Sequence, residues 1–369
     1  MTLDDLPTPC LVLDRGILQR NLDRMSRAVA RHGVALRPHM KTAKSIDVAR
    51  LAMASTHAVV GGITVSTLAE AEYFAAHGIG DILYAVGITP QKLAQVARLN
   101  ESGTAISVVT DDVEIAAFIA SQAHPPQTLV ELDCGEARGG IAPDDPALLE
   151  VAAKLGAAFG GVLTHAGHSY AGRSIPEMRA IAESERQTAL QAVARLRAAG
   201  HAVNVISVGS SPTALHAETL DGVSETRPGV YMFGDLFQAQ IETVEQDGLA
   251  LTVLASVIGR RAAERRVLID AGALALSKDR STQALEDCGF GLVRDLHGRS
   301  LGRSLVVRAN QEHGIVDLDP AIDLPAMPIG SKLRIAPNHA CLTAAAHDRY
   351  YVVDGSDNVV AIWPRVNGW

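Results

Sequence analysis

The sequence predicts an α/β chain with two domains, a (β/α)8 barrel followed by an all-β domain. Three observations lead to this prediction. Helix patterns alternate with short apolar strand patterns from about residue 16 to 240, polar and glycine-rich segments follow most of these strands, and the helical pattern disappears after about residue 245. We expect the barrel to cover 16–240 and the β domain to cover 241–369 together with 1–15.

The composition is that of a globular protein that binds a small molecule. Its 369 residues are 47% hydrophobic, which is enough to build a core in each of two domains. The net charge of -8 offers nucleic acid no basic face and an anionic membrane no polybasic run. Apolar runs are too short to cross a bilayer. We therefore expect a small-molecule partner, and neither nucleic acid nor membrane.

The cysteines predict a reducing compartment. Cys10, Cys134, Cys288 and Cys341 are scattered without a CxxC pair. The amino terminus MTLDDLPTPC is acidic and lacks the apolar core of a secretion signal. We expect reduced thiols and a cytoplasmic protein.

The alternation begins with a helix at 16–33. Its apolar residues recur at steps of three and four, as on the buried face of an amphipathic helix, and Gly33 ends it. A strand follows, and the same alternation continues through helix-like segments that are often rich in alanine. The eight strands are expected at 34–39, 59–65, 81–86, 105–110, 128–134, 161–166, 203–209 and 228–233.

Eight repeats favour a closed barrel over an open doubly wound sheet, which is the structural alternative. Alternating strands and helices pair in parallel through crossovers, and eight of them close a barrel. The segments PHMKTAK, VSTLAE, DCGEARGG, HAGHSY, GSSPT and RPGVY all follow predicted strands. Barrel enzymes place their chemistry on that face.

The second domain shows strand patterns punctuated by Gly, Pro, Asn and Asp. The amino-terminal segment TPCLVLD is also strand-like, and we expect it to pair with this domain rather than with the barrel. The strand-rich segments of the domain are 249–259, 265–277, 304–318, 330–342, 349–355 and 358–366.

Lys41, in the stretch RPHMKTAKS, is the candidate for a covalent link to a cofactor. It follows the first predicted strand of the barrel. An amine at the carboxyl end of a barrel strand can form a Schiff base with an aldehyde. An exposed cation at the start of a helix is the alternative, because lysine is mostly exposed.

Two loops are suited to hold a phosphate group. VGSSPTAL precedes a helix-like stretch, so its amides and hydroxyls can bind an anion, and RPGVYMF lies at the next strand end. Loops after strands seven and eight of a barrel are a frequent phosphate site, although glycine and serine also serve ordinary turns. Together with the lysine, these loops indicate a phosphorylated aldehyde, pyridoxal 5′-phosphate. The residues concerned are Gly209, Ser210, Ser211, Gly229 and Val230.

Arg138 in DCGEARGG and Tyr170 in HAGHSY are candidate polar contacts for the pyridine ring, its phenolic oxygen or a substrate carboxylate. A salt-bridged surface arginine and a half-buried tyrosine are the alternatives.

His339 and Cys341, in APNHACLT, are candidate ligands of a divalent metal. On an extended strand, residues two apart point to the same side, so imidazole and thiolate can reach one ion. Two protein ligands leave coordination positions open for substrate, as a catalytic Lewis acid requires. The alternative is a buried cysteine beside a structural histidine.

Taken in order, these motifs resemble those of the fold-type III pyridoxal-phosphate enzymes, in the branch of D-threonine aldolase, D-serine dehydratase and D-threo-3-hydroxyaspartate dehydratase. The similarity runs from TPCLVLD through RPHMKTAKS, HAGHSY, VGSSPTAL, RPGVYMFGD and NQEHG to PNHACLT. It implies an alanine-racemase-like (β/α)8 TIM barrel with a C-terminal all-β domain, and a homodimer. On this resemblance the cofactor site comprises Lys41, Arg138, Tyr170, Ser210, Ser211, Gly229, Val230 and Tyr231, and the metal ligands are His339 and Cys341.

The resemblance implies a lyase that depends on pyridoxal phosphate and a divalent metal (Zn, Mn or Mg) and acts on D-3-hydroxy amino acids. Cys341 favours a dehydratase, because dehydratases of this branch tend to pair histidine with cysteine while some bacterial D-threonine aldolases have aspartate there. In a dehydratase, Lys41 removes the α-proton while the metal polarises the β-hydroxyl, giving a 2-oxo acid and ammonia. Retro-aldol cleavage to glycine and an aldehyde is the alternative. An amino-acid racemase and a non-catalytic carrier of the cofactor are more distant ones.

Overall fold

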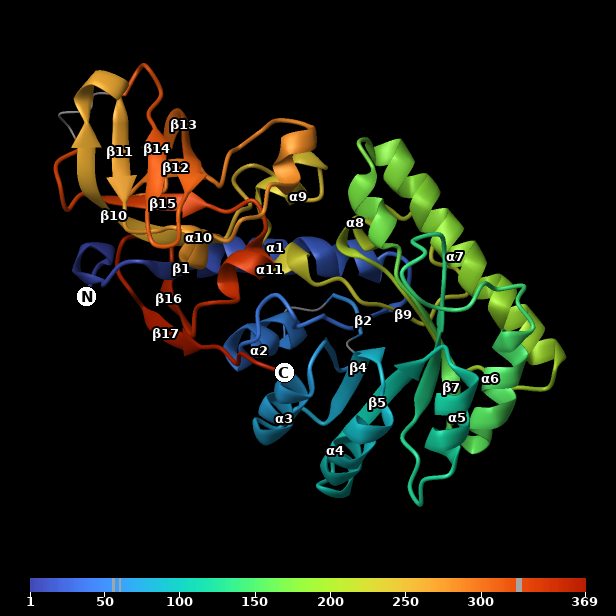
Figure 1. The fold of residues 1–369 in the computed structure, drawn as a ribbon. Coiled ribbons are helices and arrows are strands. Elements are labelled where there is room, and N and C mark those ends of the chain that lie inside the picture. The colour runs from blue at the N-terminus through green and yellow to red at the C-terminus, as the bar shows by residue number, and fades with distance from the viewer. Residues whose placement is uncertain (55–56, 60, 323–326) are drawn as a thin grey trace. The chain divides into compact units, whose positions relative to one another are not determined.

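The computed structural model describes residues 1–54, 57–59, 61–322 and 327–369, and Val60 of the expected strand 59–65 lies outside them. The chain divides into two compact units. One consists of Met1–Leu22 and Val230–Asn367, and the other of Asp23–Gly229 and Gly368–Trp369 (Figure 1). Each unit is built around its own sheet.

The core of the unit Asp23–Gly229 is a parallel sheet of eight strands, as the alternating sequence pattern predicts. Their bounds are β2 (Ala35–Leu36), β3 (Ile63–Val65), β4 (Asp81–Gly87), β5 (Ala105–Thr110), β6 (Thr128–Leu132), β7 (Phe159–Thr164), β8 (Val205–Val208) and β9 (Glu225–Thr226). The strand order is β2-β9-β8-β7-β6-β5-β4-β3.

The two ends of this strand order meet through Thr64 of β3. The amide of Thr64 donates to the carbonyl of Pro38 at 2.9 Å, and the amide of Met40 donates to the carbonyl of Thr64 at 2.8 Å. These bonds join the segment after β2 to β3, so the sheet curls round on itself. The predicted barrel is confirmed against the open sheet.

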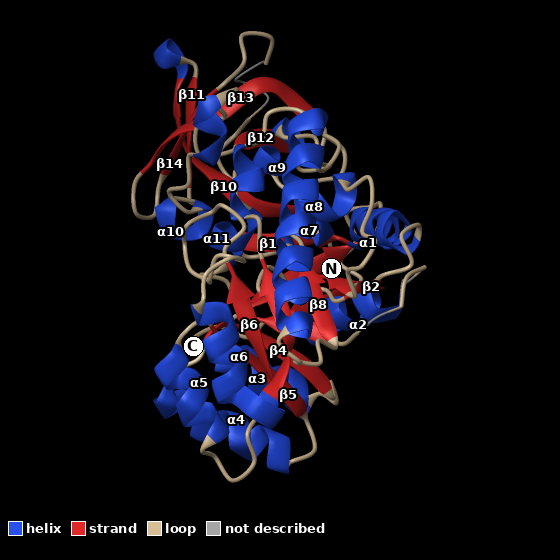
Figure 2. Ribbon diagram, turned by 90° about the vertical axis from the view of Figure 1, so that its right-hand side faces the viewer, coloured by secondary structure: helices blue, strands red, loops and turns tan. Residues whose placement is uncertain are grey.

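Helices connect the strands of the barrel, and α3, α4, α5 and α6 lie along the outside of the sheet (Figure 2). Side-chain caps start several of them; Thr67 accepts from the Glu70 amide and Asp112 from the Ile115 amide. No helix within the described residues is long and apolar enough to cross a membrane. The bounds are α1 (Arg15–Ala30), α2 (Ile46–Ala54), α3 (Leu68–Ala76), α4 (Pro90–Glu101), α5 (Val113–Ala120), α6 (Ala147–Leu155), α7 (Ile175–Ala198) and α8 (Ser211–His216).

The expected strand at 228–233 is wrong. The eighth strand is β9, which ends at Thr226, and the 3-10 turn η4 (Val230–Met232) occupies the expected position. Pro228 has no amide hydrogen with which to continue a ladder. The segment reads as a strand because its apolar side chains are buried, as in the interior of a sheet.

A mixed sheet of nine strands forms the core of the other unit. The strands are β1 (Cys10–Asp14), β10 (Leu251–Arg261), β11 (Arg266–Ile269), β12 (Leu292–Asp295), β13 (Ser300–Ala309), β14 (Gly314–Asp317), β15 (Lys332–Ala336), β16 (Arg349–Val353) and β17 (Ala361–Pro364). Their order is β11-β14-β13-β12-β15-β10-β1-β16-β17, and β10 also pairs with β11. That extra pairing closes six of the strands into an antiparallel barrel.

The amino-terminal strand belongs to this sheet, as expected. β1 pairs antiparallel with β10 and parallel with β16. The unit is not purely β, because it also contains short helices at α9 (Leu236–Gln240), α10 (Ala273–Leu276) and α11 (Ala340–Ala344). Helices of one turn carry too few residues to show a period of 3.6 in the sequence.

The side chain of Leu11 in β1 is fully buried, so its removal tests whether β1 contributes to the core. Leu11→Ala should lower the free energy of unfolding by about 2–5 kcal/mol, because a cavity remains where the side chain packed. Leu285, which is 48% exposed, gives a matched control whose alanine variant should change stability by less than about 0.5 kcal/mol. Urea denaturation measures both, and equal losses would contradict this role of β1.

Candidate functional site

A cavity of about 350 Å³ lies at the carboxyl ends of the barrel strands. Its walls come from the last residues of β4, β6 and β7 and from the segments that follow β2, β3, β6, β7, β8 and β9. This is the face on which the sequence places the polar segments. The ionisable residues in its lining are His39, Lys41, Glu131, Arg138, His165 and Arg227.

Lys41 lines this cavity, in a turn that follows β2. The preceding residue, Met40, is tied to β3 through its bond to Thr64, so the backbone of the turn is held by the sheet. Lys44 differs, because its Nζ lies 2.9 Å from Oε1 of the buried Glu70. Of the two lysines in KTAK, Lys41 is therefore the one presented to the cavity.

Two histidines, the buried His39 and the half-buried His165, stand beside this lysine in the lining, and neither is among the residues that the sequence predicts. Burial, followed by the charges of Lys41 and Arg227, lowers the pKa of His39 well below its usual range. Burial also lowers the pKa of His165 to about 3. Nδ1 of His165 lies 3.2 Å from the carbonyl oxygen of Gly209, to which a neutral imidazole donates. Both rings are thus neutral near pH 7.

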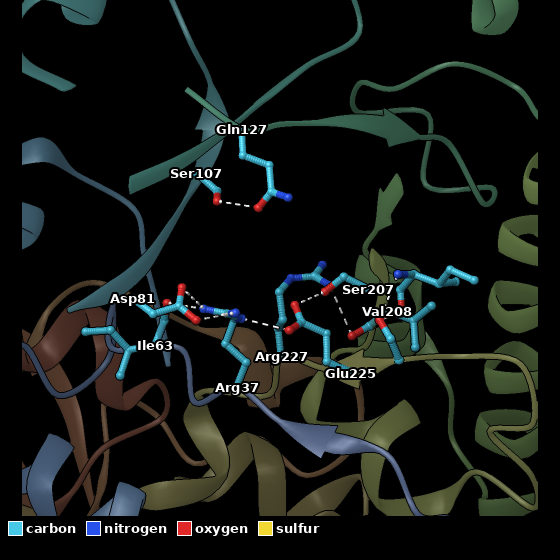
Figure 3. A network of polar contacts seen from close by, with 11 residues as sticks. Arg37, Ile63, Asp81, Ser107, Gln127, Ser207, Val208, Glu225 and Arg227 are labelled. Atoms are coloured by element: carbon cyan, nitrogen blue, oxygen red, sulfur yellow. Dashed lines mark hydrogen bonds and ion pairs between the residues drawn. The ribbon is translucent and has the colours of Figure 1, made fainter. Parts of the chain in front are cut away.

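A network of polar contacts links Arg37 to Arg227 through the buried Glu225 and Ser207 (Figure 3). Nε of Arg37 donates to Glu225 at 2.8 Å, and its Nη1 donates to Asp81 at 2.9 Å. The hydroxyl of Ser207 donates to the other oxygen of Glu225 at 2.5 Å. Ser207 accepts in turn from Nη1 of Arg227 at 2.7 Å. The network therefore holds the positively charged guanidinium of Arg227 in a fixed position.

Arg227 is a candidate binding residue that sequence reasoning missed. It is 5% exposed, yet it lines the cavity. Nη2 also donates to the carbonyl of Thr164 at 2.7 Å, so the guanidinium is locked against the end of β7. It can donate to an anionic or ring-nitrogen acceptor in the cavity. The signal available in the sequence is an arginine immediately after a barrel strand, in the segment RPGVYMF.

Arg138 lies in the cavity lining and also forms an ion pair, and its role as a ligand contact stays a prediction. Its Nη1 lies 3.6 Å from Oε1 of Glu136, and its side chain is 58% exposed. Glu131 faces the same cavity. Burial raises the pKa of Glu131, and the charge of Arg138 opposes that rise. The cavity thus combines three cationic side chains with one carboxyl group.

The loop after β8 is buried and tightly hydrogen bonded. Ser210 caps α8, where its amide donates to Oγ1 of Thr213 at 3.0 Å. The amide of Gly209 donates to Oε1 of Glu185 at 3.0 Å. The amides of Gly209 and Ser210 thus each have an acceptor inside the protein, and an anion held by this loop stays a prediction. Ser211 follows at the first helical position and is fully buried.

Gly229 lies against the segment that carries the lysine. A Cβ at this position would lie 2.9 Å from the carbonyl oxygen of His39, so only glycine permits the approach. Tyr170 lies in the 3-10 turn η3 (Gly167–Ala171), which follows β7. Val230 and Tyr231 are buried residues of the other unit.

His339 and Cys341 lie at the start of a helix, so the expected extended geometry is wrong. His339 is the N-cap residue of α11, and Cys341 is in the first turn. The helix begins here because Asp235 accepts from the amide of Ala340 at 2.9 Å and the amide of Thr343 donates to the carbonyl of His339. The two side chains nonetheless interact, since Cys341 helps to raise the pKa of His339.

The surroundings of this pair favour a positive charge. Nδ1 of His339 lies 3.7 Å from Oδ2 of Asp279. Burial alone would lower the pKa of His339, but Asp279, Cys341 and Asp235 together raise it to about 11. A divalent cation is favoured by the same anionic groups, and it binds the neutral imidazole in place of the proton. The donor set therefore fits a metal.

A metal at this site would have two protein ligands. Across residues 1–54, 57–59, 61–322 and 327–369, no group of three His, Cys, Asp or Glu side chains is arranged to hold a metal. A metal held by His339 and Cys341 alone leaves positions for water or substrate, as a catalytic site does.

Comparisons with known proteins match both units of the chain. The model for the N-terminal domain of alanine racemase matches residues 13–236, and the model for a putative serine dehydratase domain matches 250–353. A D-threo-3-hydroxyaspartate dehydratase from Delftia sp. (strain HT23) is 44% identical over 381 residues, covering 100% of this chain and 99% of that protein. A 3-hydroxy-D-aspartate aldolase from Paracoccus denitrificans (strain Pd 1222) is 29% identical, covering 99% and 92%.

Similarity extends to solved structures. A cysteine-to-alanine variant of D-threo-3-hydroxyaspartate dehydratase, in its metal-free form, superposes with a TM-score of 0.96 and 42% sequence identity. The superposition covers 100% of both chains. The metal-free form of this variant implies that the dehydratase holds a metal in its native form.

His165 gives a pH prediction. Its pKa is about 3 in the folded protein and 6.5 in an ordinary histidine, so the unfolded chain binds the proton first as pH falls. The stabilisation is complete above pH 6.5 and is lost toward pH 3, by up to about 1.4 kcal/mol per pH unit. His165→Asn should therefore give a shallower fall in unfolding free energy between about pH 7 and about pH 4. Urea titrations with identical pH slopes would contradict a buried neutral imidazole.

Proposed function

We propose that this chain, which belongs to the family that joins an alanine racemase N-terminal domain to a serine dehydratase domain, is a lyase that depends on pyridoxal phosphate and a divalent metal. Its proposed substrates are D-3-hydroxy amino acids, from which it eliminates water to give a 2-oxo acid and ammonia. The observation that carries the proposal is Lys41 at the wall of a cationic cavity on the carboxyl face of the barrel.

Retro-aldol cleavage to glycine and an aldehyde is the second candidate, because an aldolase is among the relatives. Elimination is favoured by two observations. The dehydratase relative is 44% identical and the aldolase 29%. The second candidate metal ligand, Cys341, is the residue type that dehydratases of this branch tend to use. A racemase would need no metal, whereas His339 and Cys341 lie in a field that favours one.

The residues of the barrel fit pyridoxal phosphate. Lys41 supplies the amine that carries the aldehyde, and Arg138 and Arg227 supply cations for its polar ring substituents or for the substrate carboxylate. We propose the loop of Ser210 and Ser211 for the phosphate group. When bound, the cofactor supplies an electron sink that stabilises negative charge at Cα. The cofactor contacts also proposed are Tyr170, Gly229, Val230 and Tyr231.

Lys41 is the proposed base. Its amine moves the proton at Cα, and the neutral state of His39 and His165 keeps two further positive charges away from it. Elimination breaks the Cα–H bond and the Cβ–O bond, releasing the hydroxyl as water. The enamine product then takes up water and loses ammonia, so the balance is one substrate to one 2-oxo acid and one ammonia.

His339 and Cys341 are the proposed metal ligands, and the carboxylate of Asp279, 3.7 Å from Nδ1 of His339, helps to orient the imidazole. The metal, when bound, supplies a Lewis acid for the β-hydroxyl. Zn, Mn and Mg are the candidates.

Three broader properties are part of the same proposal. A homodimer is proposed by analogy with the family. A cytoplasmic location is supported by four cysteines that are all free thiols. We propose that 16–240 is the cofactor domain and that 241–369, with 1–15, is the metal domain.

The proposed reaction is tested by identifying products from D-threo-3-hydroxyaspartate, D-serine and D-threonine. With pyridoxal phosphate and Mn²⁺ or Zn²⁺ present, we expect ammonia and a 2-oxo acid, and EDTA should abolish their formation. Cys341→Ala should behave as EDTA does, because one of the two ligands is lost. Glycine and an aldehyde as products would show retro-aldol cleavage instead of elimination. Turnover that persists in EDTA would contradict the proposed dependence on a metal.

Lys41→Ala should remove the visible absorbance band of bound cofactor and reduce turnover by orders of magnitude, because no amine remains to carry the aldehyde. Lys154→Ala, on the exposed side of α6, is the matched control and should retain both. Persistence of the band in the Lys41 variant would mean that another lysine carries the cofactor.

A further inference from the structure

Glu185 is a carboxylate of α7 that is 1% exposed. Its Oε1 accepts a hydrogen bond from the amide of Ala166 at 2.9 Å and another from the amide of Gly209 at 3.0 Å. Ala166 lies just beyond the end of β7, and Gly209 directly follows β8. One side-chain oxygen therefore ties together the loops that follow two neighbouring barrel strands.

A carboxylate in this position is costly unless it is fully hydrogen bonded. Burial raises the pKa of Glu185, while the bonds from Gly209, Thr213 and Ala166 and the charge of Arg227 oppose that rise. An apolar side chain would fill the same space without that desolvation cost, but it would leave two buried amides without acceptors. The carboxylate therefore serves to accept the hydrogen bonds of these two loop amides rather than to fill space in the core.

The hydrogen bonds of Glu185 continue into the loop after β8. A carboxylate only accepts, so the hydroxyl of Thr213 donates to Glu185. Oγ1 of Thr213 accepts from the amide of Ser210 at 3.0 Å and lies 3.1 Å from its hydroxyl. The hydroxyl of Ser210 lies 2.8 Å from that of Ser169 in η3. These four side chains are all at most 2% exposed.

We propose that Glu185 is a positioning residue that holds the loops after β7 and β8 in the arrangement that binds the phosphate group of the cofactor. It acts through the amides of Ala166 and Gly209 and through the hydroxyls of Thr213 and Ser210. Its hydrogen-bond donors are groups of the protein itself, so it acts on the phosphate only through them. This inference rests on the proposed use of pyridoxal phosphate.

The role of Glu185 predicts a selective effect on phosphorylated ligands. Pyridoxal has the same aldehyde and ring as pyridoxal phosphate but lacks the phosphate group, so its binding depends on Lys41 and the ring contacts alone. Loss of Glu185 should weaken binding of the phosphorylated aldehyde and spare binding of the other. A carboxylate that merely stabilised the barrel would affect the two ligands equally.

The experiment compares dissociation constants of both aldehydes with the full-length protein, stripped of cofactor and followed by absorbance. Glu185→Ala should weaken the binding of pyridoxal phosphate about 10- to 100-fold, because buried amides lose their acceptor. Binding of pyridoxal should change by less than about twofold. Glu185→Gln should rescue most of the affinity, since its carbonyl oxygen can still accept from both amides.

The matched control is Glu183→Gln, two residues earlier on α7, where the side chain is 46% exposed and pairs with Arg186. It should leave both affinities unchanged. Thr213→Val serves if the alanine variant fails to fold, because it interrupts the same chain at the next residue. This variant should weaken the binding of pyridoxal phosphate more than the binding of pyridoxal.

Equal losses for the two aldehydes, or no loss for either, would overturn the role of Glu185 while leaving the proposed cofactor intact. Failure of the unaltered protein to bind pyridoxal phosphate would overturn the proposed function, and this inference with it. A selective loss that glutamine rescues supports the inference.

Discussion

The pair of hydrogen bonds between Thr64 and the segment after β2 is the contact on which the rest of the site depends. These bonds join the last strand of the sheet order to the first and close the barrel. They also fix Met40, and the neighbouring Lys41 lines the cavity at the carboxyl ends of the strands. Gly229 packs against His39 on the other side of this segment. The same hydrogen bonds therefore close the barrel and hold the segment that carries the candidate nucleophilic amine.

The electrostatic design of the cavity follows from what is buried around that amine. Lys41, Arg138 and Arg227 bring positive charge, whereas burial keeps His39 and His165 neutral. The guanidinium of Arg227 is held through Ser207 and Glu225 to a network that reaches Arg37 (Figure 3). A cation held in this way, as Arg227 is, suits an anionic ligand because the guanidinium needs no rearrangement when the ligand binds.

The architecture and the principal candidates could be predicted from the sequence, because their signals are local. The period of three and four residues along 16–33 marks α1, and the strand-like TPCLVLD is β1 of the β-rich unit. The eighth strand was misplaced because β9 has only two residues, too few to show alternation, while the buried run 228–233 imitates a strand. His339 and Cys341 were placed on a strand because a helix of five residues leaves no periodic trace.

The supporting residues could not be found in the same way, because their roles arise from contacts between distant segments. Arg227 is locked by the carbonyl of Thr164, 63 residues earlier in the chain. Glu185 acts on Ala166 and Gly209, and nothing in the sequence of α7 sets it apart from the exposed Glu183. The sequence pattern shows which residue types are available, and the fold decides which of them lie at the cavity.

The most direct test of the account is chemical identification of the lysine that carries the cofactor. The protein would be saturated with pyridoxal phosphate, reduced with borohydride, digested and mapped by mass spectrometry. We expect a pyridoxyl adduct on Lys41. An adduct on Lys44 or Lys278 in its place, or a protein that acquires none, would contradict it.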